Sequence, residues 1–226
     1  MSADKYWDQY YTENTYRTGK EPSPFLSSMM HRLQRGKVLD IGMGEGANAV
    51  FLAKQGFNVK GFDISTIAVE RAQNLAKEQN VSIDANRADL DLYLMGLLEY
   101  DSIIMMNFKP VLTRYYSEII RALKQGGTLL VEAPSMEEIR DLIPTEEAYR
   151  NYFFGSNELF HHIKGLRILF YQEGLVYGKH MIQCLALKPL DKDAVKYGLF
   201  DMHSKQKDTG PSHQLKLAES FFKKKD

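Results

Sequence analysis

Glycine recurs at every second position in one stretch of this sequence, Asp40-Ile-Gly-Met-Gly-Glu-Gly46. Without a Cβ, each glycine lets the backbone take a positive φ and pass close to a ligand. An apolar run, 38–41, precedes the stretch, and residues 47–55 after it have a helical pattern. The start of such a helix presents free N–H groups and partial positive charge to an anionic or polar ligand. The pattern is typical of a loop that holds a nucleotide-like cofactor in an α/β domain.

Two cofactors fit this loop. Residues 42–47 satisfy the pattern G-x-G-x-x-G/A, and Asp63 follows about 20 residues later, as in dinucleotide-binding domains. Asp40, two residues before Gly42, favours S-adenosylmethionine (SAM) instead, because a carboxylate attracts the cationic amino group of that cofactor. A pyrophosphate gains nothing from a carboxylate there. A glycine-rich turn without any ligand is the third interpretation.

Two further carboxylates follow predicted strands. Asp63 ends the second predicted strand, 57–62, and is placed to accept hydrogen bonds from both ribose hydroxyls of a nucleoside. Asp89 follows a third predicted strand, 81–85, beside the place where an adenine edge would lie. The alternative for Asp89 is that it caps a short helix, predicted over residues 92–98.

Candidate residues for contact with a substrate follow the fourth predicted strand, 101–106. Asn107, Phe108 and Lys109 would form the wall next to the transferred group, and Lys109 could attract an anionic substrate. His161, with His162 beside it, could supply a general base, although a histidine pair at a helix end also fits a structural role. No metal site is predicted.

The first residues of the chain are rich in aromatic side chains. The i, i+4 spacing places four of them on one face of a helix, namely Tyr6, Trp7, Tyr10 and Tyr11. This helix either packs on the domain or forms a lid over a ligand, and Tyr16 and Phe154 are further candidates to close over the acceptor.

Composition narrows the class of protein. The chain has 226 residues, 44% hydrophobic and 26% charged, which suits one α/β domain with additions. Its 29 basic and 29 acidic residues cancel, so no global field attracts nucleic acid, and a nucleic acid partner is not expected. Cys184 is the single cysteine and reads as a core residue. With no run of 18 apolar residues and no signal-peptide pattern, we expect a cytoplasmic protein without a membrane segment, monomeric or homodimeric.

The elements that must position these residues alternate along the chain. Five predicted strands are separated by helices over 47–55, 67–77 (capped by Ser65) and 111–124, the last ended by residues 125–127, and the fifth strand covers 128–132. This order predicts a doubly wound parallel sheet that binds ligands at the carboxyl ends of its strands. A helix is also predicted over 25–33, before the first strand. After the fifth strand we predict a helical stretch over 136–152, a helix over 158–163 capped by Ser156 or Asn157, and two antiparallel strands, 167–171 and 177–187.

These motifs resemble the class I SAM-dependent methyltransferases, and within them the tellurite-resistance (TehB-like) group. The resemblance covers roughly residues 5–188 and rests on the segments 38–46, 51–63, 88–90, 100–104 and 122–131. It implies a Rossmann-like, mostly parallel seven-stranded sheet with a final antiparallel strand. It also implies a cofactor site composed of Asp40, Gly42, Met43, Gly44, Gly46, Asp63, Ile64, Asp89, Leu90, Met106 and Asn107.

Two positions depart from the family pattern. Met43 stands where the family usually has cysteine or another small residue. Residues 107–110 are not the Asn/Asp-Pro-Pro-aromatic signature of methylases that act on amino groups of bases or glutamine, which disfavours those substrates.

The sequence therefore predicts methyl transfer from SAM to a small-molecule acceptor, such as a thiol or a chalcogen oxyanion like tellurite. The alternatives are a methylase of tRNA or protein, a SAM-binding protein without turnover, and a nicotinamide dehydrogenase. The predicted organisation is an aromatic N-terminal segment (1–35), a SAM-binding domain (36–188) and a lysine-rich extension (189–226) with a loop over 203–212 and a helix over 215–222.

Overall fold

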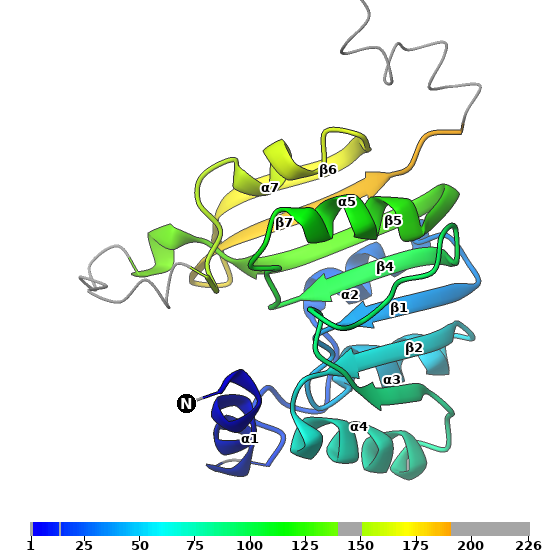
Figure 1. Ribbon diagram of the computed structural model, residues 1–226, viewed down its shortest axis with the longest axis vertical. Coiled ribbons are helices and arrows are strands. Elements are labelled where there is room, and N and C mark those ends of the chain that lie inside the picture. The colour runs from blue at the N-terminus through cyan, green and yellow to red at the C-terminus, as the bar shows by residue number, and fades with distance from the viewer. Residues whose placement is uncertain (1, 14, 140–150, 191–226) are drawn as a thin grey trace, which may run out of the picture. The chain divides into compact units, whose positions relative to one another are not determined.

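A seven-stranded sheet forms the centre of the computed structural model, which describes residues 2–13, 15–139 and 151–190 (Figure 1). The strand order is β3-β2-β1-β4-β5-β7-β6. The strands are β1 (Lys37–Ile41), β2 (Asn58–Asp63), β3 (Asp84–Arg87), β4 (Tyr100–Met106), β5 (Leu123–Pro134), β6 (Arg167–Val176) and β7 (Lys179–Leu187). β1 to β5 pair in parallel, whereas β7 pairs antiparallel with both β5 and β6. The predicted doubly wound sheet with antiparallel strands at its end is thus confirmed.

The direction of winding reverses between β1 and β4. The chain proceeds from β1 outward to β2 and β3, and then returns to pair β4 with β1 on the other side. At such a switch point the loops after the two strands separate and leave a crevice at the carboxyl edge of the sheet. The glycine turn after β1 and residues 107–110 after β4 lie at this edge.

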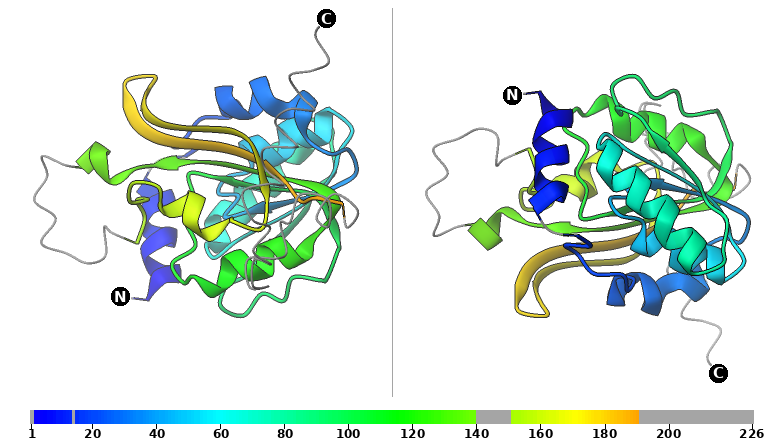
Figure 2. Two further views of the ribbon diagram at one scale, coloured as in Figure 1. Left: turned by 90° about the horizontal axis from the view of Figure 1, so that it is seen from above. Right: turned by 90° about the horizontal axis from the view of Figure 1, so that it is seen from below.

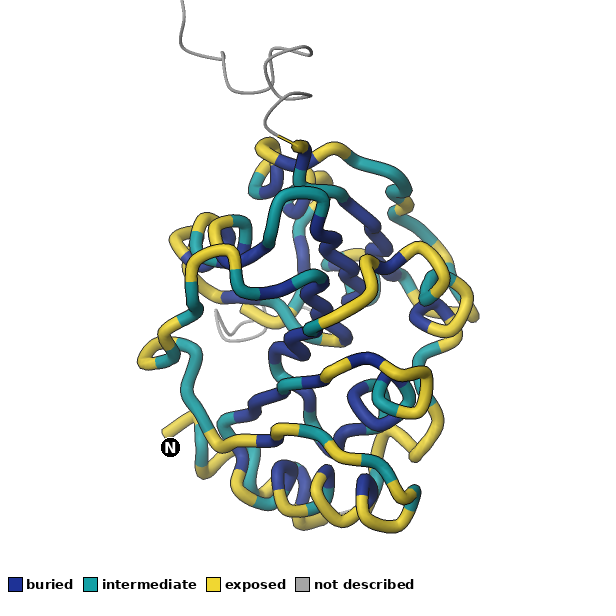
Figure 3. The backbone as a smooth tube through the Cα atoms, turned by 90° about the vertical axis from the view of Figure 1, so that its right-hand side faces the viewer, coloured by how far each residue is buried: buried dark blue, intermediate teal, exposed yellow. Residues whose placement is uncertain are grey.

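Helices cover both faces of the sheet (Figure 2). Odd-numbered residues of β1 and β4, such as Leu39 and Ile103, share a buried cluster with α5 (Arg114–Ala122) and α7 (Glu158–His162). Even-numbered residues, such as Val38 and Ile104, pack against α2 (Pro24–Met29) and α3 (Ala47–Lys54). This alternation follows from the two-residue period of a strand, and it buries the central strands on both sides (Figure 3).

Two more helices complete the side of the sheet that carries β2. α4 (Thr66–Glu78) begins after Ser65, whose side chain accepts a hydrogen bond from Ala68 N–H, so the predicted cap is confirmed. α1 (Ala3–Glu13) packs against α4 and presents its aromatic face inward at Tyr11, which is buried. α1 therefore lies beside the glycine turn.

Several predicted boundaries are wrong for identifiable reasons. Residues 92–98 form turns rather than a helix, and Leu92 and Leu94 are almost fully exposed. β3 starts at Asp84, three residues later than expected, because Val81 ends α4 through its N–H to Ala76 O. β5 begins at Leu123, so Gly126 and Gly127 lie within β5 instead of ending the preceding helix.

Three shorter elements also differ from prediction. Pro24–Met29 is α-helical, as its cap Ser23 indicates, but Met30–Arg32 tightens into a 3-10 turn. Asn157 precedes α7 in a left-handed conformation and makes no side-chain capping bond. Of the predicted 136–152 helix, the structure describes a 3-10 turn, η2 (Met136–Ile139), and residues 151–152.

Other predictions lie outside the described residues. These are the middle of the 136–152 segment, the loop over 203–212, the helix over 215–222 and nearly all of the lysine-rich extension. Among the residues that the structure describes, no helix combines the length and apolar character needed to span a bilayer.

Candidate cofactor site

The glycine turn connects β1 to α3 at the carboxyl edge of the sheet. Gly44 has a φ of +54°, a conformation that a side chain with a Cβ rarely adopts. Met43 N–H donates to Phe62 O and ties the turn to β2. The turn is therefore held against the neighbouring strand.

Each of the three glycines makes room for a different neighbour. A Cβ on Gly42 would come 2.4 Å from Phe108, and one on Gly44 would come 2.9 Å from the Tyr11 hydroxyl. A Cβ on Gly46 would come 2.6 Å from the Cβ of Ala72 in α4. Gly46 thus serves helix packing, whereas Gly42 and Gly44 face aromatic side chains on the side expected for a ligand.

Asp63 fixes the turn from the end of β2. Its carboxylate accepts hydrogen bonds from Gly44 N–H and from Ser65 N–H, each at 2.9 Å. The side chain is buried, and burial raises the pKa of Asp63 although both N–H donors oppose that shift. The residue predicted for the ribose therefore also sets the conformation of the glycine turn, a role that sequence reasoning missed.

Asp40 is a buried carboxylate without a hydrogen-bond partner among the described residues. Only 1% of its surface is exposed, and neither side-chain oxygen finds a donor. Burial, and then the negative charge of Asp63, raises the pKa of Asp40 to about 8. An unpaired buried carboxylate is costly. A cationic group near Asp40 would relieve this cost and bring the pKa back down.

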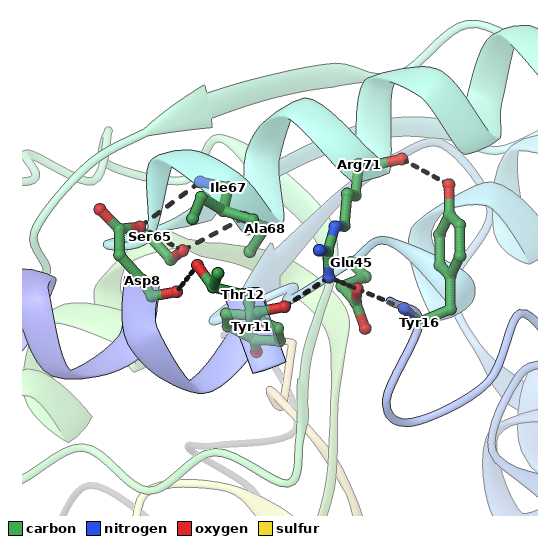
Figure 4. A network of polar contacts seen from close by, with 9 residues as sticks. All are labelled: Asp8, Tyr11, Thr12, Tyr16, Glu45, Ser65, Ile67, Ala68 and Arg71. Atoms are coloured by element: carbon green, nitrogen blue, oxygen red, sulfur yellow. Dashed lines mark hydrogen bonds and ion pairs between the residues drawn. The ribbon is translucent and has the colours of Figure 1, made fainter. Parts of the chain in front are cut away.

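Sequence reasoning also missed Glu45, the residue between the last two glycines. Its carboxylate is 2.7 Å from Arg71 Nη1 in α4 and accepts a hydrogen bond of 2.7 Å from Tyr16 N–H (Figure 4). The same Arg71 nitrogen donates to the main-chain carbonyl of Tyr11 at 2.6 Å. The sequence signal was an acidic residue between two glycines of a turn that must pack closely, because a carboxylate buried there needs a basic partner.

The other residues predicted to bind the cofactor differ in what their side chains contact. Met43 is buried with Val69 and Ala72, and its sulfur fills the space beside Gly61. Asp89 accepts a hydrogen bond from Asp91 N–H and stabilises its own turn, but it caps no helix, because residues 92–98 do not form one. Three others follow or end a strand at the same edge, namely Ile64 after β2, Leu90 after β3 and Met106 at the end of β4.

The acceptor-side candidates are held by the rest of the fold. Asn107 is exposed, has a left-handed φ of +56°, and donates its N–H to Glu132 O in β5. Phe108 packs against Gly42. The Lys109 amine donates to Glu158 at 2.8 Å and to Phe153 O at 2.8 Å. Lys109, a predicted substrate contact, therefore joins the strand-four loop to α7.

The two histidines have distinct environments. His161 is exposed on α7 and contacts Phe160 edge-on, whereas His162 stacks on Tyr116 with ring centroids 4.3 Å apart. Neither contact brings His161 to the glycine turn, so the structure offers no support for His161 as a base. Cys184 is buried, and burial raises the pKa of its thiol to about 12, which agrees with the predicted core role.

A cavity of about 220 Å³ lies at a different part of the same edge. It is lined by residues that follow β5 and by the β6–β7 hairpin, among them Ser135, Phe154, Glu173 and His180. Within the described ranges, no group of three or more His, Cys, Asp or Glu is arranged to hold a metal ion.

The residues at the glycine turn fit the cofactor that the sequence implies. Three buried carboxylates, Asp40, Glu45 and Asp63, meet there, and Arg71 neutralises one of them through its ion pair with Glu45. Burial raises the pKa of both Asp40 and Asp63, so the ammonium and sulfonium of SAM would stabilise their ionised forms, whereas a pyrophosphate would oppose their ionisation. The cradle formed by Gly42 and Gly44 adds the close approach that such a ligand needs.

Comparisons with known proteins agree with this assignment. Residues 38–127 match the model of a family described as a methyltransferase domain. A ribosomal protein L11 methyltransferase of Dictyoglomus thermophilum is 33% identical over 119 residues, or 51% of this chain and 39% of the relative. A 2-heptyl-1-hydroxyquinolin-4(1H)-one methyltransferase of Mycobacteroides abscessus is 30% identical over 120 residues, or 49% of this chain and 52% of the relative. The chain thus spans about half or less of the length of these relatives.

A solved structure shares the fold. The crystal structure of TehB from Haemophilus influenzae superposes with a TM-score of 0.62 at 19% identity, covering 80% of this chain and 67% of that one. At this identity the likeness concerns the fold, and it leaves the TehB-like subgroup as a prediction. The glycine turn and the sheet thus belong to a Rossmann-like, mostly parallel seven-stranded fold, and residues 38–127 are similar to methyltransferase domains.

Proposed function

We propose that this protein transfers the methyl group of SAM to a small-molecule acceptor. The observation that carries the proposal is the buried carboxyl of Asp40, which has no hydrogen-bond partner among the described residues and precedes a glycine turn that contains Glu45 and is bound by Asp63. The carboxyl of Asp40 would ionise beside a cationic group, which suits a ligand that carries two such groups. It disfavours the dinucleotide interpretation, in which a pyrophosphate would meet the same carboxylates.

Asp63 and Asp40 would bind the cofactor, and Phe108 would shield the methyl group from water. When bound, SAM supplies a methyl group on a sulfonium, and transfer is a direct in-line displacement by the acceptor. Asp63 would accept hydrogen bonds from the ribose hydroxyls, and Asp40 would face the ammonium. Phe108, which packs against Gly42, would help to exclude water from the path between acceptor and methyl group.

The acceptor side favours a nucleophile that is already ionised. Lys109 is engaged by Glu158, His161 is exposed, and Asn107 cannot accept a proton at neutral pH. A thiolate, a selenolate or a reduced chalcogen oxyanion such as tellurite needs little base catalysis, whereas an alcohol or an amine needs a general base. The acceptors that we propose are therefore soft anions.

Macromolecular acceptors remain the second candidate, because one relative is named for methylation of a ribosomal protein. A net charge of zero speaks against an RNA acceptor, since phosphate contacts require clustered basic residues. A shared fold alone does not decide function, because related folds carry unrelated chemistry. A SAM-binding protein without turnover is the third candidate.

Two experiments separate these candidates. Calorimetric titration with S-adenosylhomocysteine (SAH) and with NAD identifies the cofactor, and we expect heat of binding from SAH alone. Radiolabelled SAM is then screened with thiols, tellurite, small acids, amines, total tRNA and total protein. Label in a small-molecule fraction supports the proposal, and label confined to tRNA or protein contradicts it. SAH binding without label in any fraction would indicate a silent binding protein.

A further inference from the structure

Helix α1 is hydrogen-bonded at two points to residues at the start of α4, on the cofactor side of the sheet. Near its middle, the Asp8 carboxylate accepts hydrogen bonds from the Ser65 hydroxyl at 2.6 Å and from Ile67 N–H at 3.4 Å (Figure 4). Near its end, the carbonyl of Tyr11 accepts a hydrogen bond from Arg71 Nη1 at 2.6 Å. Both partners belong to the first turns of α4, so α1 is held to one rigid element.

The hydrogen bond between Arg71 and Tyr11 is linked to the glycine turn. Arg71 Nη1 also lies 2.7 Å from Glu45 Oε1, and this oxygen accepts the N–H of Tyr16, in the segment after α1. The Tyr16 hydroxyl donates a hydrogen bond of 3.2 Å to the main-chain carbonyl of Arg71. Glu45 is 1% exposed at its side chain and Arg71 18%, so this ion pair is shielded from water.

The side chain of Tyr11 lies over Gly44 as a result. Its hydroxyl occupies the place where a Cβ of Gly44 would point, which is also the surface proposed for the cofactor. Burial raises the pKa of Tyr11, and the charge of Asp63 adds to this effect, so the hydroxyl stays neutral. A ligand that passes over Gly44 must contact Tyr11 or displace it.

We propose that Arg71 is a positioning residue that couples the glycine turn to helix α1. Because Arg71 holds Glu45 of the turn and the end of α1 with the same nitrogen, a change in the turn on cofactor binding moves Tyr11. Conversely, the placement of Tyr11 sets the affinity of the turn for the cofactor. This inference rests on the proposed SAM site and adds to it two residues outside the glycine motif.

The chain contains its own reporter for this coupling. Trp7 is the single tryptophan, and its ring lies in α1, 6.2 Å from the ring of Tyr11 and 5.6 Å from that of Tyr152. Movement of Tyr11 changes the surroundings of Trp7, so the tryptophan emission of the whole protein reports on α1. We expect SAH to change this emission in the unmodified chain.

The main test measures SAH affinity by calorimetry and Trp7 emission in Arg71→Met. We expect an affinity loss of about tenfold or more and loss of the SAH-dependent emission change. Arg71→Lys, which keeps the charge, should restore part of both. Arg17→Met is the matched control, because Arg17 pairs with Glu13 of α1 at 3.3 Å, whereas the partners of Glu45 are Arg71 and Tyr16 N–H. Its SAH affinity should stay within about twofold of the unmodified chain.

The double variant Arg71→Met/Glu45→Gln separates positioning from stability. Arg71→Met alone leaves Glu45 buried without its ion pair, which lowers the thermal midpoint. Removing the charge of Glu45 as well should recover much of that midpoint, while the SAH-dependent emission change stays absent. Recovery of the emission change together with the midpoint would overturn the proposal, because Arg71 would then act through stability alone.

Two results distinguish failure of this inference from failure of the proposed function. If the unmodified chain binds no SAH, the proposed cofactor site is wrong and the coupling falls with it. If the unmodified chain binds SAH and Arg71→Met binds it equally, with the same emission change, the cofactor site stands and the coupling is refuted.

Discussion

The carboxyl edge of the sheet has two sides that are built in different ways. On the side of β1 and β2, one continuous stretch provides Asp40 and the glycine turn, and Asp63 stands at the end of the next strand. On the side of β4 and β5, Lys109 is fixed by Glu158, and Ser135 bridges to Phe154. The predicted cofactor residues of the first side thus lie close together in sequence, although α1 contacts this side from 60 residues away in the case of Tyr11 and Arg71. On the second side, the candidate Lys109 is itself fixed by a residue 49 positions away, Glu158.

This difference explains which predictions succeeded. The cofactor side is encoded by residue types at fixed short spacings, so sequence alone placed the turn, Asp63 and the cap Ser65 correctly. The acceptor side depends on tertiary contacts, and nothing local to Lys109 indicates that Glu158 engages its amine. Arg71 was missed for the same reason, since its partner Glu45 is 26 residues away. The helix predicted over 92–98 failed because exposed leucines imitate an apolar stripe.

The largest loss of SAH affinity should come from a side chain added to the glycine turn. Gly44→Val adds a branched side chain where φ is +54° and where the Tyr11 hydroxyl is 2.9 Å from the new Cβ. We expect SAH affinity to fall by about 100-fold or more, or about 2.7 kcal/mol, in calorimetry. Gly165→Val is the control, because a Cβ there meets no atom within 4 Å. Equal SAH binding by both variants would place the cofactor elsewhere.

The next largest effect is a pH dependence of thermal stability that arises from Asp40. Since burial raises the pKa of Asp40 to about 8, from 3.8, the protonated form favours the folded state. Its stabilising contribution is complete below pH 3.8 and is lost as pH rises through about 8. Asp40→Asn should therefore raise the thermal midpoint of the ligand-free protein more at pH 8 than at pH 5. An equal change at both pH values would show that Asp40 is already ionised.

Cofactor binding should depend on the same proton. The ammonium of SAH lowers the pKa of Asp40, so binding releases a proton below pH 8 and SAH affinity rises between pH 6 and pH 8. In Asp40→Asn the affinity should be lower and independent of pH over this range. Calorimetry in buffers of different ionisation enthalpy measures the released proton directly.

A smaller effect, on stability alone, is expected on the acceptor side. Lys109→Met removes the ion pair with Glu158 and the hydrogen bond to Phe153 O, which should cost about 2 kcal/mol of unfolding free energy. SAH affinity should stay within about twofold, since Lys109 is fixed to α7 rather than to the glycine turn. A large loss of SAH affinity with unchanged denaturant stability would show that the two sides are not separable.

The smallest effect is expected at His161. The residue is exposed on α7, so His161→Ala should change unfolding free energy by less than about 0.5 kcal/mol. Methyl transfer to the acceptor found in the radiolabel screen should be unchanged from pH 6 to pH 9. A loss of activity that follows the titration of an imidazole would return His161 to the role of base.

The most direct test of the central claim is a crystal structure of the unmodified chain with SAH bound. It should show the ribose hydroxyls on Asp63, the ammonium near Asp40 and the methionine chain over Gly42 and Gly44, with Tyr11 moved or in contact. SAH in the cavity lined by Ser135 and His180, with Tyr11 and Phe108 still covering the two glycines, would contradict the account.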